Sequence, residues 1–305
     1  MAYVDHITEI SPNGTTDWGL GDWVPVKSVT PKELTSSLYY YTDARILARS
    51  AALIGKTEDA KQYEMLAARI ADAINTKYLN RETGLYGTGL QTELSAPLFW
   101  GIVPSELKEK VVNNLVNRVH ADGDHLDVGL LGTKTLLNAL SENGHAELAY
   151  KLAAAETFPS WGYWIKNGAT SLYENWPINA KSDISRNHIM FGEIGAWLYK
   201  SPGGIRPDPE APGFKHVLLA PHFVGGLASF DARHSGPYGE IVSAWKSTGD
   251  KVQYTAVVPY NSTATLRVVA KSLSITSKTN AEVLPEGNQK VVKLPAGTHT
   301  FEIVL

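Results

Sequence analysis

The feature that most constrains the fold of this chain is a change of sequence period close to residue 204. Upstream of it, apolar residues recur at the spacing that is typical of amphipathic helices. Downstream, short runs rich in Val, Ile, Thr and Tyr alternate between apolar and polar positions, as half-buried strands do. The two patterns meet at GGIRPDPEAPGF, whose prolines and glycines no helix could traverse. We therefore predict two domains, with residues 1–204 built from helices and residues 205–305 built from strands.

Helix boundary signals divide the first domain into a series of helical hairpins. Thr30 and Glu33 have the spacing of a capping box, and Pro31 would occupy the first helical position. Gly55 predicts the end of this helix, and a second helix is expected to begin at Thr57. Further helices are predicted at 91–100, 104–121, 127–143, 145–155 and 184–200. The pattern indicates an array of about seven helices joined by short turns.

The second domain has the pattern of an antiparallel β-sandwich. Its alternating runs are HVLLAPHF, LASFDARH, EIVSAWKS, KVQYTAVV, TATLRVV, SLSITS, KVVKLP and HTFEIVL. Gly, Pro, Asn and Ser separate these runs, as expected of turns between neighbouring strands.

Composition excludes several classes of partner and site. The formal net charge of −3 does not suggest nucleic acid or an anionic membrane as a partner. The absence of cysteine excludes disulfides and thiolate metal sites, and no phosphate loop, HExxH, GxSxG or dinucleotide motif occurs. No apolar run reaches membrane-spanning length, and the first residues lack the regions of a secretory signal. We expect a soluble protein without cofactor, metal or membrane insertion. The sequence does not distinguish between the cytoplasm, the periplasm and the cell exterior as its compartment.

Aromatic residues are unusually dense in segment 158–177. It holds one carboxylate, Glu174, and three tryptophans, Trp161, Trp164 and Trp176. Its glycines and Pro159 should prevent a regular helix, so we expect an irregular loop in which Trp161 and Trp164 face the same cavity as Glu174. Flat aromatic faces match the C–H faces of sugar rings, and Glu174 would be suited to proton transfer. The alternative is that the tryptophans are core residues and that Glu174 only caps or ion-pairs at a helix start.

A second candidate cluster lies in the Gly-rich loop TTDWGLGDWVPV, residues 15–26. It carries Asp17, Trp18, Asp22 and Trp23 just ahead of the first clear helix. Loops at the mouth of a helical array commonly collect binding groups. Asp22 would bond vicinal sugar hydroxyls while the indole of Trp23 packs on the ring, and the alternative for Asp22 is an Asx turn.

Three further residues are weaker candidates. Glu93 in LQTELS would either point into the interior of the helical array or only begin a helix, and Asp127 in HLDVG leaves the same two alternatives. His188 in RNHIMFGEIG precedes a helix rich in small residues. A single histidine is more often structural than catalytic, and it offers no metal-ligand spacing.

Several of these segments together carry a family resemblance. In order along the chain they are WGLGDWVP, TPKELTSSLYYY, TGLYGTGLQTELS, HLDVGLLGTKTLLNAL, PSWGYWIKNGATSLYENW, NHIMFGEIGAWLY and GGIRPDPEAPGF. From about residue 15 to its end, the chain resembles the bacterial α-L-rhamnosidases of glycoside hydrolase family 78. GATSLYENW and NHIMFG are the specific segments, whereas the GD and TG fragments alone would be weak.

The resemblance implies both a fold and a mechanism. The catalytic domain of the family is an (α/α)6 barrel followed by a C-terminal β-sandwich. It cleaves terminal α-L-rhamnose with inversion, using one glutamic acid as general acid and a second glutamate, in the segment GATxxxE, as general base. The base then falls on Glu174, and the expected partners are L-rhamnose-containing glycosides or polysaccharides. The candidate substrate-binding residues are Asp22, Trp23, Trp161, Trp164 and His188 by motif position, together with Trp18, Trp176 and Glu93.

One part of the family pattern is missing. The general acid of the family lies in an upstream segment of the type DxPxRxExxGWxGD, and no such string occurs here. An inverting site needs two carboxyl groups about 6.5–9.5 Å apart, and only Glu174 can be identified. We therefore expect the chain to be the rear part of the barrel plus the sandwich, without the general acid and able to associate through the incomplete barrel. The alternatives are a sugar-binding remnant without catalysis and another hydrolase or lyase on an (α/α) barrel.

Overall fold

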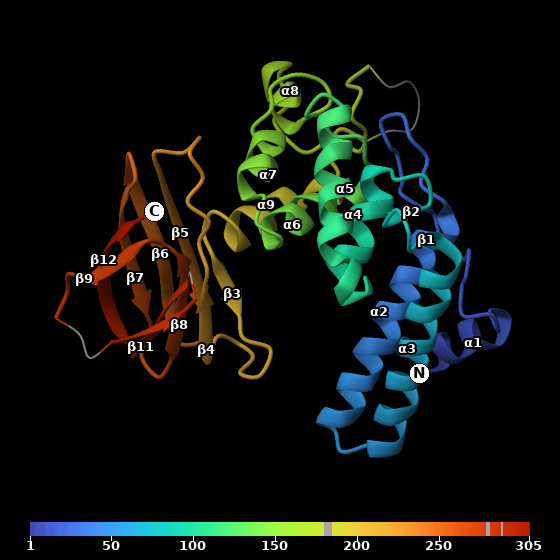
Figure 1. Cartoon of the computed structure of the whole chain (residues 1–305), viewed down its shortest axis with the longest axis horizontal. Helices are drawn as coiled ribbons and strands as arrows, with labels where there is room; N and C mark the ends of the chain where they lie inside the picture. Colours follow the sequence, from blue (N-terminus) through green and yellow to red (C-terminus); the bar gives the residue numbers. More distant parts are fainter. Residues whose placement is uncertain (180–184, 279–280, 288) are drawn as a thin grey trace. The chain divides into compact units, whose positions relative to one another are not determined.

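Two compact units, Met1–Glu193 and Ile194–Leu305, make up the chain (Figure 1). The computed structural model describes residues 1–179, 185–278, 281–287 and 289–305. The first unit is helical apart from one short hairpin, and the second carries the remaining strands. No helix within the described ranges is both long enough and apolar enough to cross a membrane.

The first unit is built from helical hairpins. Its helices are α1 (Ala2–Ile10), α2 (Lys32–Leu53), α3 (Thr57–Tyr78), α4 (Gln91–Trp100), α5 (Lys108–Ala121), α6 (Leu130–Glu142), α7 (Ala146–Ala153) and α8 (Trp161–Lys166), with the 3-10 turns η1 (Ser105–Leu107) and η2 (Ile189–Phe191). α2 packs on α3, α4 on α5 and α6 on α7, and α4 also contacts both α2 and α6. The pair of α2 and α3 is drawn in blue in Figure 1. A hairpin of β1 (Leu79–Asn80) and β2 (Leu85–Tyr86) lies between α3 and α4.

Burial separates these helices into an inner and an outer set. In α3 the buried residues form a single stripe, Tyr63, Ala67, Ile70 and Ile74. In α4, by contrast, every residue from Gln91 to Leu98 is buried, and most of α6 is buried as well. A helix that is covered all round has neighbours on every side, so α4 and α6 are inner helices and α3 is an outer one. This arrangement confirms the predicted partial barrel of helical hairpins.

The start of α2 differs from the prediction. Pro31 is the N-cap residue rather than the first helical residue, and no side chain caps the helix. Glu33 does not form a capping box with Thr30, because its carboxylate accepts hydrogen bonds from the Thr15 hydroxyl (2.6 Å) and from Lys77 (2.6 Å). Glu33 therefore joins the loop before α2 to the end of α3.

Two other helix predictions also need correction. α8 forms despite Pro159, because the hydroxyl of Ser160 accepts the N–H of Tyr163 (2.9 Å) and so caps a new helix just after the proline. Within the stretch 184–200, whose first residue lies outside the described residues, regular α-helix begins only at α9 (Glu193–Lys200). The short helix α1 was not predicted.

The second unit is a sandwich of two five-stranded sheets. Its strands are β3 (Ile205–Pro207), β4 (His216–Leu219), β5 (Ser229–Gly236), β6 (Gly239–Thr248), β7 (Lys251–Val258), β8 (Thr263–Val269), β9 (Ser272–Ile275), β10 (Glu282–Glu286), β11 (Gln289–Leu294) and β12 (Gly297–Val304). One sheet has the order β10-β11-β8-β4-β3 and the other β5-β6-β7-β12-β9. The pairings of these sheets are antiparallel except that β4 runs parallel to β8. The predicted β-sandwich is confirmed, with β3 and β10 as strands that were not predicted.

The two sheets enclose one hydrophobic core. Tyr254 of β7 lies opposite Trp245 of β6 on one side and Phe301 of β12 on the other. All three rings are buried in one cluster with Leu266 of β8, which belongs to the other sheet. The Tyr254 hydroxyl hydrogen-bonds with Ser243 (2.9 Å), so this buried polar group is satisfied.

Candidate active site

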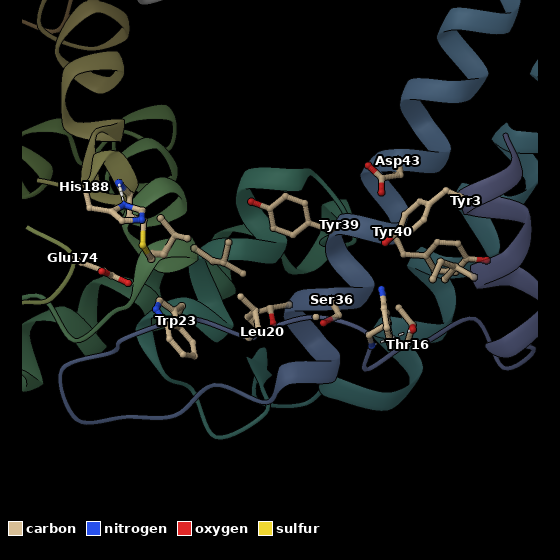
Figure 2. A pocket seen from close by; sticks show the side chains of 18 residues that line it. Tyr3, Thr16, Leu20, Trp23, Ser36, Tyr39, Tyr40, Asp43, Glu174 and His188 are labelled. Atoms are coloured by element: carbon tan, nitrogen blue, oxygen red, sulfur yellow. Dashed lines mark hydrogen bonds between the residues drawn. The ribbon is translucent and has the colours of Figure 1, made fainter. Parts of the chain in front are cut away.

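A cavity of about 640 Å³ opens in the first unit, which is within the usual range for small-molecule sites. It is lined by Tyr3 and Ile7 of α1, by Thr16, Trp18, Gly19, Leu20, Gly21 and Trp23 of the following loop, by Thr35, Ser36, Tyr39, Tyr40 and Asp43 of α2, by Leu130 and Leu131 of α6, and by Glu174, His188 and Met190. Figure 2 shows Glu174, His188 and Trp23 toward one end of the cavity. Asp43, Tyr40 and Tyr3 lie toward the other end, with Leu20, Ser36 and Tyr39 between the two groups.

Asp22 fastens the loop before α2 to the start of α6. Its Oδ1 accepts the N–H groups of Leu131 (2.9 Å) and Gly132 (3.0 Å), and its Oδ2 accepts the N–H of Gly129 (2.9 Å). The Thr92 hydroxyl of α4 donates to Oδ2 at 2.6 Å. Burial raises the pKa of this carboxyl, and the four hydrogen bonds oppose that rise. Contrary to the prediction, Asp22 has no free oxygen for a sugar hydroxyl and acts as an N-cap for a helix elsewhere in the chain.

The same hydrogen bonds between the Asp22 loop and α6, which we call the Asp22 clamp, position Trp23 at the cavity. The carbonyl of Trp23 accepts the N–H of Leu130 (2.9 Å), so the loop also pairs the first amide of α6. A Cβ at Gly129 would lie 2.3 Å from that carbonyl oxygen, and one at Gly132 would lie 2.1 Å from Oγ1 of Thr92. The two glycines therefore allow the close approach that brings Trp23 beside the α6 terminus.

Glu93 and Asp127 are also structural residues. The Glu93 carboxylate accepts the N–H groups of Thr88 (2.8 Å) and Leu90 (2.9 Å) at the start of its own helix α4. Of the two alternatives for Glu93, the structure supports a residue that begins a helix, and this residue is absent from the cavity lining. The Asp127 carboxylate accepts the N–H of Lys27 (2.9 Å) and so holds the loop that precedes α2.

The tryptophans of segment 158–177 form a buried cluster rather than a cavity wall. Trp164 stacks on Trp176 with ring centroids 5.0 Å apart, and Trp176 lies 4.4 Å from the ring of Phe191. Each indole N–H donates to a main-chain carbonyl: Trp161 to Phe191, Trp164 to Trp176, and Trp176 to Val128. The prediction that Trp161 and Trp164 face the cavity is wrong, because α8 turns both rings into this cluster and their polar atoms are already satisfied.

The buried cluster nevertheless supports Glu174. Trp176, two residues further along the chain, is fully buried and fixes the end of the segment. Glu174 pairs with Ser185 twice, because its N–H donates to the Ser185 carbonyl (3.0 Å) and its Oε2 accepts the Ser185 N–H (2.9 Å). Only Ser185, among the described residues, bonds to this carboxylate, which is half-buried at the cavity.

His188 lies beside Glu174 through the same pairing of chain segments. Its N–H donates to the carbonyl of Leu172 (2.9 Å). Its Nδ1 accepts the N–H of Met190 (3.1 Å), so the neutral imidazole carries its proton on Nε2. The ring can therefore offer an N–H donor at this end of the cavity.

Trp18 and Trp23 differ from the other predicted tryptophans because they stay exposed. Trp18 is 66% exposed and Trp23 42% exposed, and both line the cavity. Large aromatic faces that are open at a cavity can pack against the apolar face of a ligand.

One wall of the cavity was missed by sequence analysis. Ser36, Tyr39, Tyr40 and Asp43 lie on one face of α2 and line the cavity together. Their spacing of three, four and seven residues was the available signal, since such residues share a helix face. Burial raises the pKa of the Asp43 carboxyl. It also raises the pKa of Tyr39, to which the nearby charges of Glu193, Asp22 and Asp43 contribute.

Both parts of the chain match families of known proteins. Residues 1–201 match the bacterial alpha-L-rhamnosidase 6 hairpin glycosidase domain, and residues 204–282 match the bacterial alpha-L-rhamnosidase C-terminal domain. An alpha-L-rhamnosidase of Streptomyces avermitilis is 31% identical over 293 residues, which cover 93% of this chain and 28% of that protein. One from Formosa agariphila is 30% identical over 290 residues, covering 90% of this chain and 31% of that protein.

Solved structures agree with these matches. The alpha-L-rhamnosidase from Dictyoglumus thermophilum superposes with a TM-score of 0.90 at 30% identity, covering 99% of this chain and 36% of that one. The Streptomyces avermitilis alpha-L-rhamnosidase complexed with L-rhamnose also gives a TM-score of 0.90 at 30% identity, covering 99% of this chain and 30% of that one. The chain thus spans about a third of the length of the relatives that it matches.

Proposed function

Because the chain belongs to the bacterial α-L-rhamnosidases, with their six-hairpin glycosidase domain and C-terminal domain, we propose that its cavity binds a terminal α-L-rhamnosyl unit for hydrolysis. The observation that carries this proposal is the meeting of Trp23, Glu174 and His188, from distant stretches of the chain, at one end of one cavity (Figure 2). The relative from Streptomyces avermitilis that superposes on this chain was solved with L-rhamnose.

Each of the three residues has a distinct role in the proposed reaction. Glu174 is the general base, which takes a proton from a water molecule as the water oxygen attacks the anomeric carbon. The bond from that carbon to the leaving oxygen breaks, and the configuration inverts. Trp23 packs its exposed face on the sugar ring, and the Nε2–H of His188 donates to a ring hydroxyl.

The leaving oxygen also needs a proton, and we propose that it comes from a carboxyl group outside residues 1–305. Glu174 and Asp43 are the carboxylate residues among the described residues that line the cavity. They lie toward opposite ends of it in Figure 2, whereas an inverting pair flanks a single glycosidic bond about 6.5–9.5 Å apart.

Glutamine at position 174 separates sugar binding from catalysis. Glu174→Gln in the complete enzyme should lower kcat for an aryl α-L-rhamnoside about 10²- to 10⁴-fold, because an amide cannot take a proton from water. In the present chain the same variant should bind L-rhamnose with an affinity within about twofold of that of the parent, since the amide keeps the shape and one acceptor.

Trp23→Ala should weaken L-rhamnose binding by about 1–3 kcal/mol, measured by calorimetry.

The matched control is Glu156→Gln, which changes an exposed glutamate that pairs with Lys166 and is absent from the cavity lining. It should change neither kcat nor binding. Near-normal turnover by Glu174→Gln would remove Glu174 from the mechanism. Binding of L-rhamnose with no hydrolysis by the complete protein would instead favour a sugar-binding module.

A further inference from the structure

Three turns at one end of the sandwich each carry a proline and an aromatic residue. They read PGFK at 212–215, before β4, GPYG at 236–239, joining β5 to β6, and PYNS at 259–262, between β7 and β8. No Val, Leu, Ile or Met occurs in these turns, and none of their residues lines the cavity of the first unit. This end of the sandwich therefore presents aromatic rings and polar groups on turns that proline stiffens.

The three turns contact one another. The Ser262 hydroxyl donates to the carbonyl of Phe214 (3.0 Å), which joins the third turn to the first. A Cβ at Gly239 would lie 3.2 Å from the side chain of Pro259, so the second turn touches the third. A Cβ at Gly236 would lie 3.7 Å from the ring of Phe214, so the second turn also touches the first. Residues of all three turns therefore form one continuous surface.

Phe214 fixes this surface to the core of the sandwich. Its backbone is strained, with φ at +63°, a region that bulky residues rarely adopt and that is commonly kept where it serves a site. Its ring packs against the sandwich core, and the ring centroids of Phe214 and His234 of β5 are 4.6 Å apart. The turns are therefore held in place by the folded core and need no ligand to order them.

Two further aromatic rings of these turns are exposed. Tyr260 is 86% exposed and Tyr238 is 38% exposed. The ammonium of Lys215, an exposed residue, lies over the Tyr238 ring, 5.2 Å from its centre. We call Lys215, Tyr238 and Tyr260 the aromatic platform. It presents flat apolar faces beside hydroxyl and ammonium donors.

The chemistry of the aromatic platform favours a carbohydrate over a protein. A stable protein interface buries about 800 Å² on each partner around an apolar core, whereas the three turns offer two exposed rings without aliphatic neighbours. A sugar unit has an apolar C–H face and hydroxyl groups around its edge, which match an aromatic ring that lies beside O–H and N–H donors. Because the turns are already ordered, little conformational entropy is lost when a ligand binds.

We propose that the aromatic platform of the second unit is a binding site for a polysaccharide chain, separate from the cavity of the first unit. Sugar units of the chain stack on Tyr238 and Tyr260, and the Lys215 ammonium donates hydrogen bonds to their hydroxyl groups. The inference goes beyond the proposed function, because the site binds internal units of a polymer and uses no residue of the cavity. Its role is to retain the protein on a polymeric substrate.

The test is affinity electrophoresis of the intact chain in native gels cast with and without soluble rhamnan, a polysaccharide of L-rhamnose. We expect rhamnan to retard the chain, and the dependence of mobility on rhamnan concentration gives the dissociation constant. Tyr238→Ala and Tyr260→Ala should each raise that constant at least about fivefold, because each removes a stacking face. Tyr260→Phe keeps the ring and should stay within about twofold of the parent.

The matched control is Val269→Ala, which truncates an exposed apolar residue of β8 outside the aromatic platform. It should leave the retardation by rhamnan unchanged. Tyr260→Ala should keep the thermal midpoint of the parent, because the side chain that it removes is almost wholly exposed. Weaker binding at an unchanged midpoint therefore reports a lost contact with the polysaccharide and not a lost fold.

Trp23→Ala, at the cavity, separates this inference from the proposed function. Retardation that persists in Trp23→Ala and is lost in Tyr260→Ala supports the aromatic platform. Retardation that is lost in Trp23→Ala would place the polysaccharide in the cavity and overturn the inference. Absence of retardation of the parent would overturn it too, while calorimetry with L-rhamnose would still decide the proposed function. A dimer in sedimentation that Tyr260→Ala dissociates would assign the rings to a second copy of the chain and likewise overturn the inference.

Discussion

One carboxylate, that of Asp22, joins the loop before α2 to α4 through Thr92 and to α6 through three backbone N–H groups. Asp22→Ala leaves these buried donors unpaired and should lower the free energy of unfolding by about 2–4 kcal/mol, measured by chemical denaturation. Asp17→Ala, an exposed residue of the same loop, should change it by less than about 0.5 kcal/mol. Equal effects of the two variants would show that the clamp does not stabilise the fold.

The lowered pKa of His222 should make the stability of the second unit depend on pH. Burial, and then the nearby Arg206 cation, lowers the pKa of His222 below its ordinary value. The unfolded chain therefore binds a proton at this site more readily than the folded chain, so the stabilisation is present above the ordinary histidine pKa and is lost as the pH falls below it. The protection factors of amides in β6 and β7, which correct for the intrinsic pH dependence of exchange, should fall as the pH is lowered from about 7 to about 5, and His222→Gln should flatten this dependence. An identical pH dependence in the variant would contradict this assignment.

Sequence reasoning identified the kind of residue at the candidate site better than it identified what each residue contacts. Glu174, His188, Trp18 and Trp23 were chosen from motifs, and all four line one cavity, although their roles stay predictions. Asp22 was also predicted to bind the sugar. Its carboxylate instead accepts hydrogen bonds from backbone N–H groups that lie more than a hundred residues away in the sequence. A carboxylate in a loop has the same composition whether it binds a ligand or caps a distant helix, so only the fold separates the two.

At the scale of elements, helix α8 shows what the aromatic segment contributes. Trp164 is buried, stacks on Trp176 and donates its N–H to that residue's carbonyl. Trp164→Ala should lower the free energy of unfolding by about 3–5 kcal/mol, because a large buried ring leaves a cavity. Trp18→Ala, at an exposed indole of the cavity, should change the stability little and act on sugar binding instead. Weakened sugar binding by Trp164→Ala at unchanged stability would return Trp164 to the candidate site.

Helix and strand identities followed from periodicity, whereas their ends depended on contacts. The stripe from Tyr63 to Ile74 in α3 is visible in the sequence because an outer helix buries one face. The start of α2 was misread because Glu33 bonds to Thr15 and Lys77, which are distant in sequence, instead of its own helix terminus. Helix α8 is not predicted from the sequence because Pro159 is a helix breaker, although Ser160 directly after it caps the helix.

At the scale of the whole molecule, the switch of sequence period marked the change from helices to strands. The first strand of the sandwich, β3, begins at Ile205, close to the predicted boundary near residue 204. Packing instead divides the chain after Glu193, so most of α9 belongs to the second compact unit. Sequence period reports which element a residue belongs to and not which core it joins, so the position of the domain boundary stays a prediction.

Residues 1–305 as an isolated monomer are expected to bind L-rhamnose but to hydrolyse rhamnosides negligibly. Inversion requires a second carboxyl group about 6.5–9.5 Å from the base, across the scissile bond. Glu93 and Asp127 are committed to backbone N–H groups, and Asp43 lies toward the opposite end of the cavity from Glu174 (Figure 2). The measurement is release of rhamnose from an aryl α-L-rhamnoside, with sedimentation to establish that the species is a monomer.

If the general acid is supplied from outside residues 1–305, as we propose, adding that segment should restore turnover. The chain covers about a third of the length of its relatives, and the test uses the complete enzyme or an added partner segment as the source of the proposed acid. Glu174→Gln should abolish the restored activity, because water would then lack its base. Robust turnover by the isolated monomer would contradict this expectation and make Asp43 the first candidate for the acid, since burial already raises the pKa of its carboxyl. In that event Asp43→Asn would stop hydrolysis of the aryl α-L-rhamnoside.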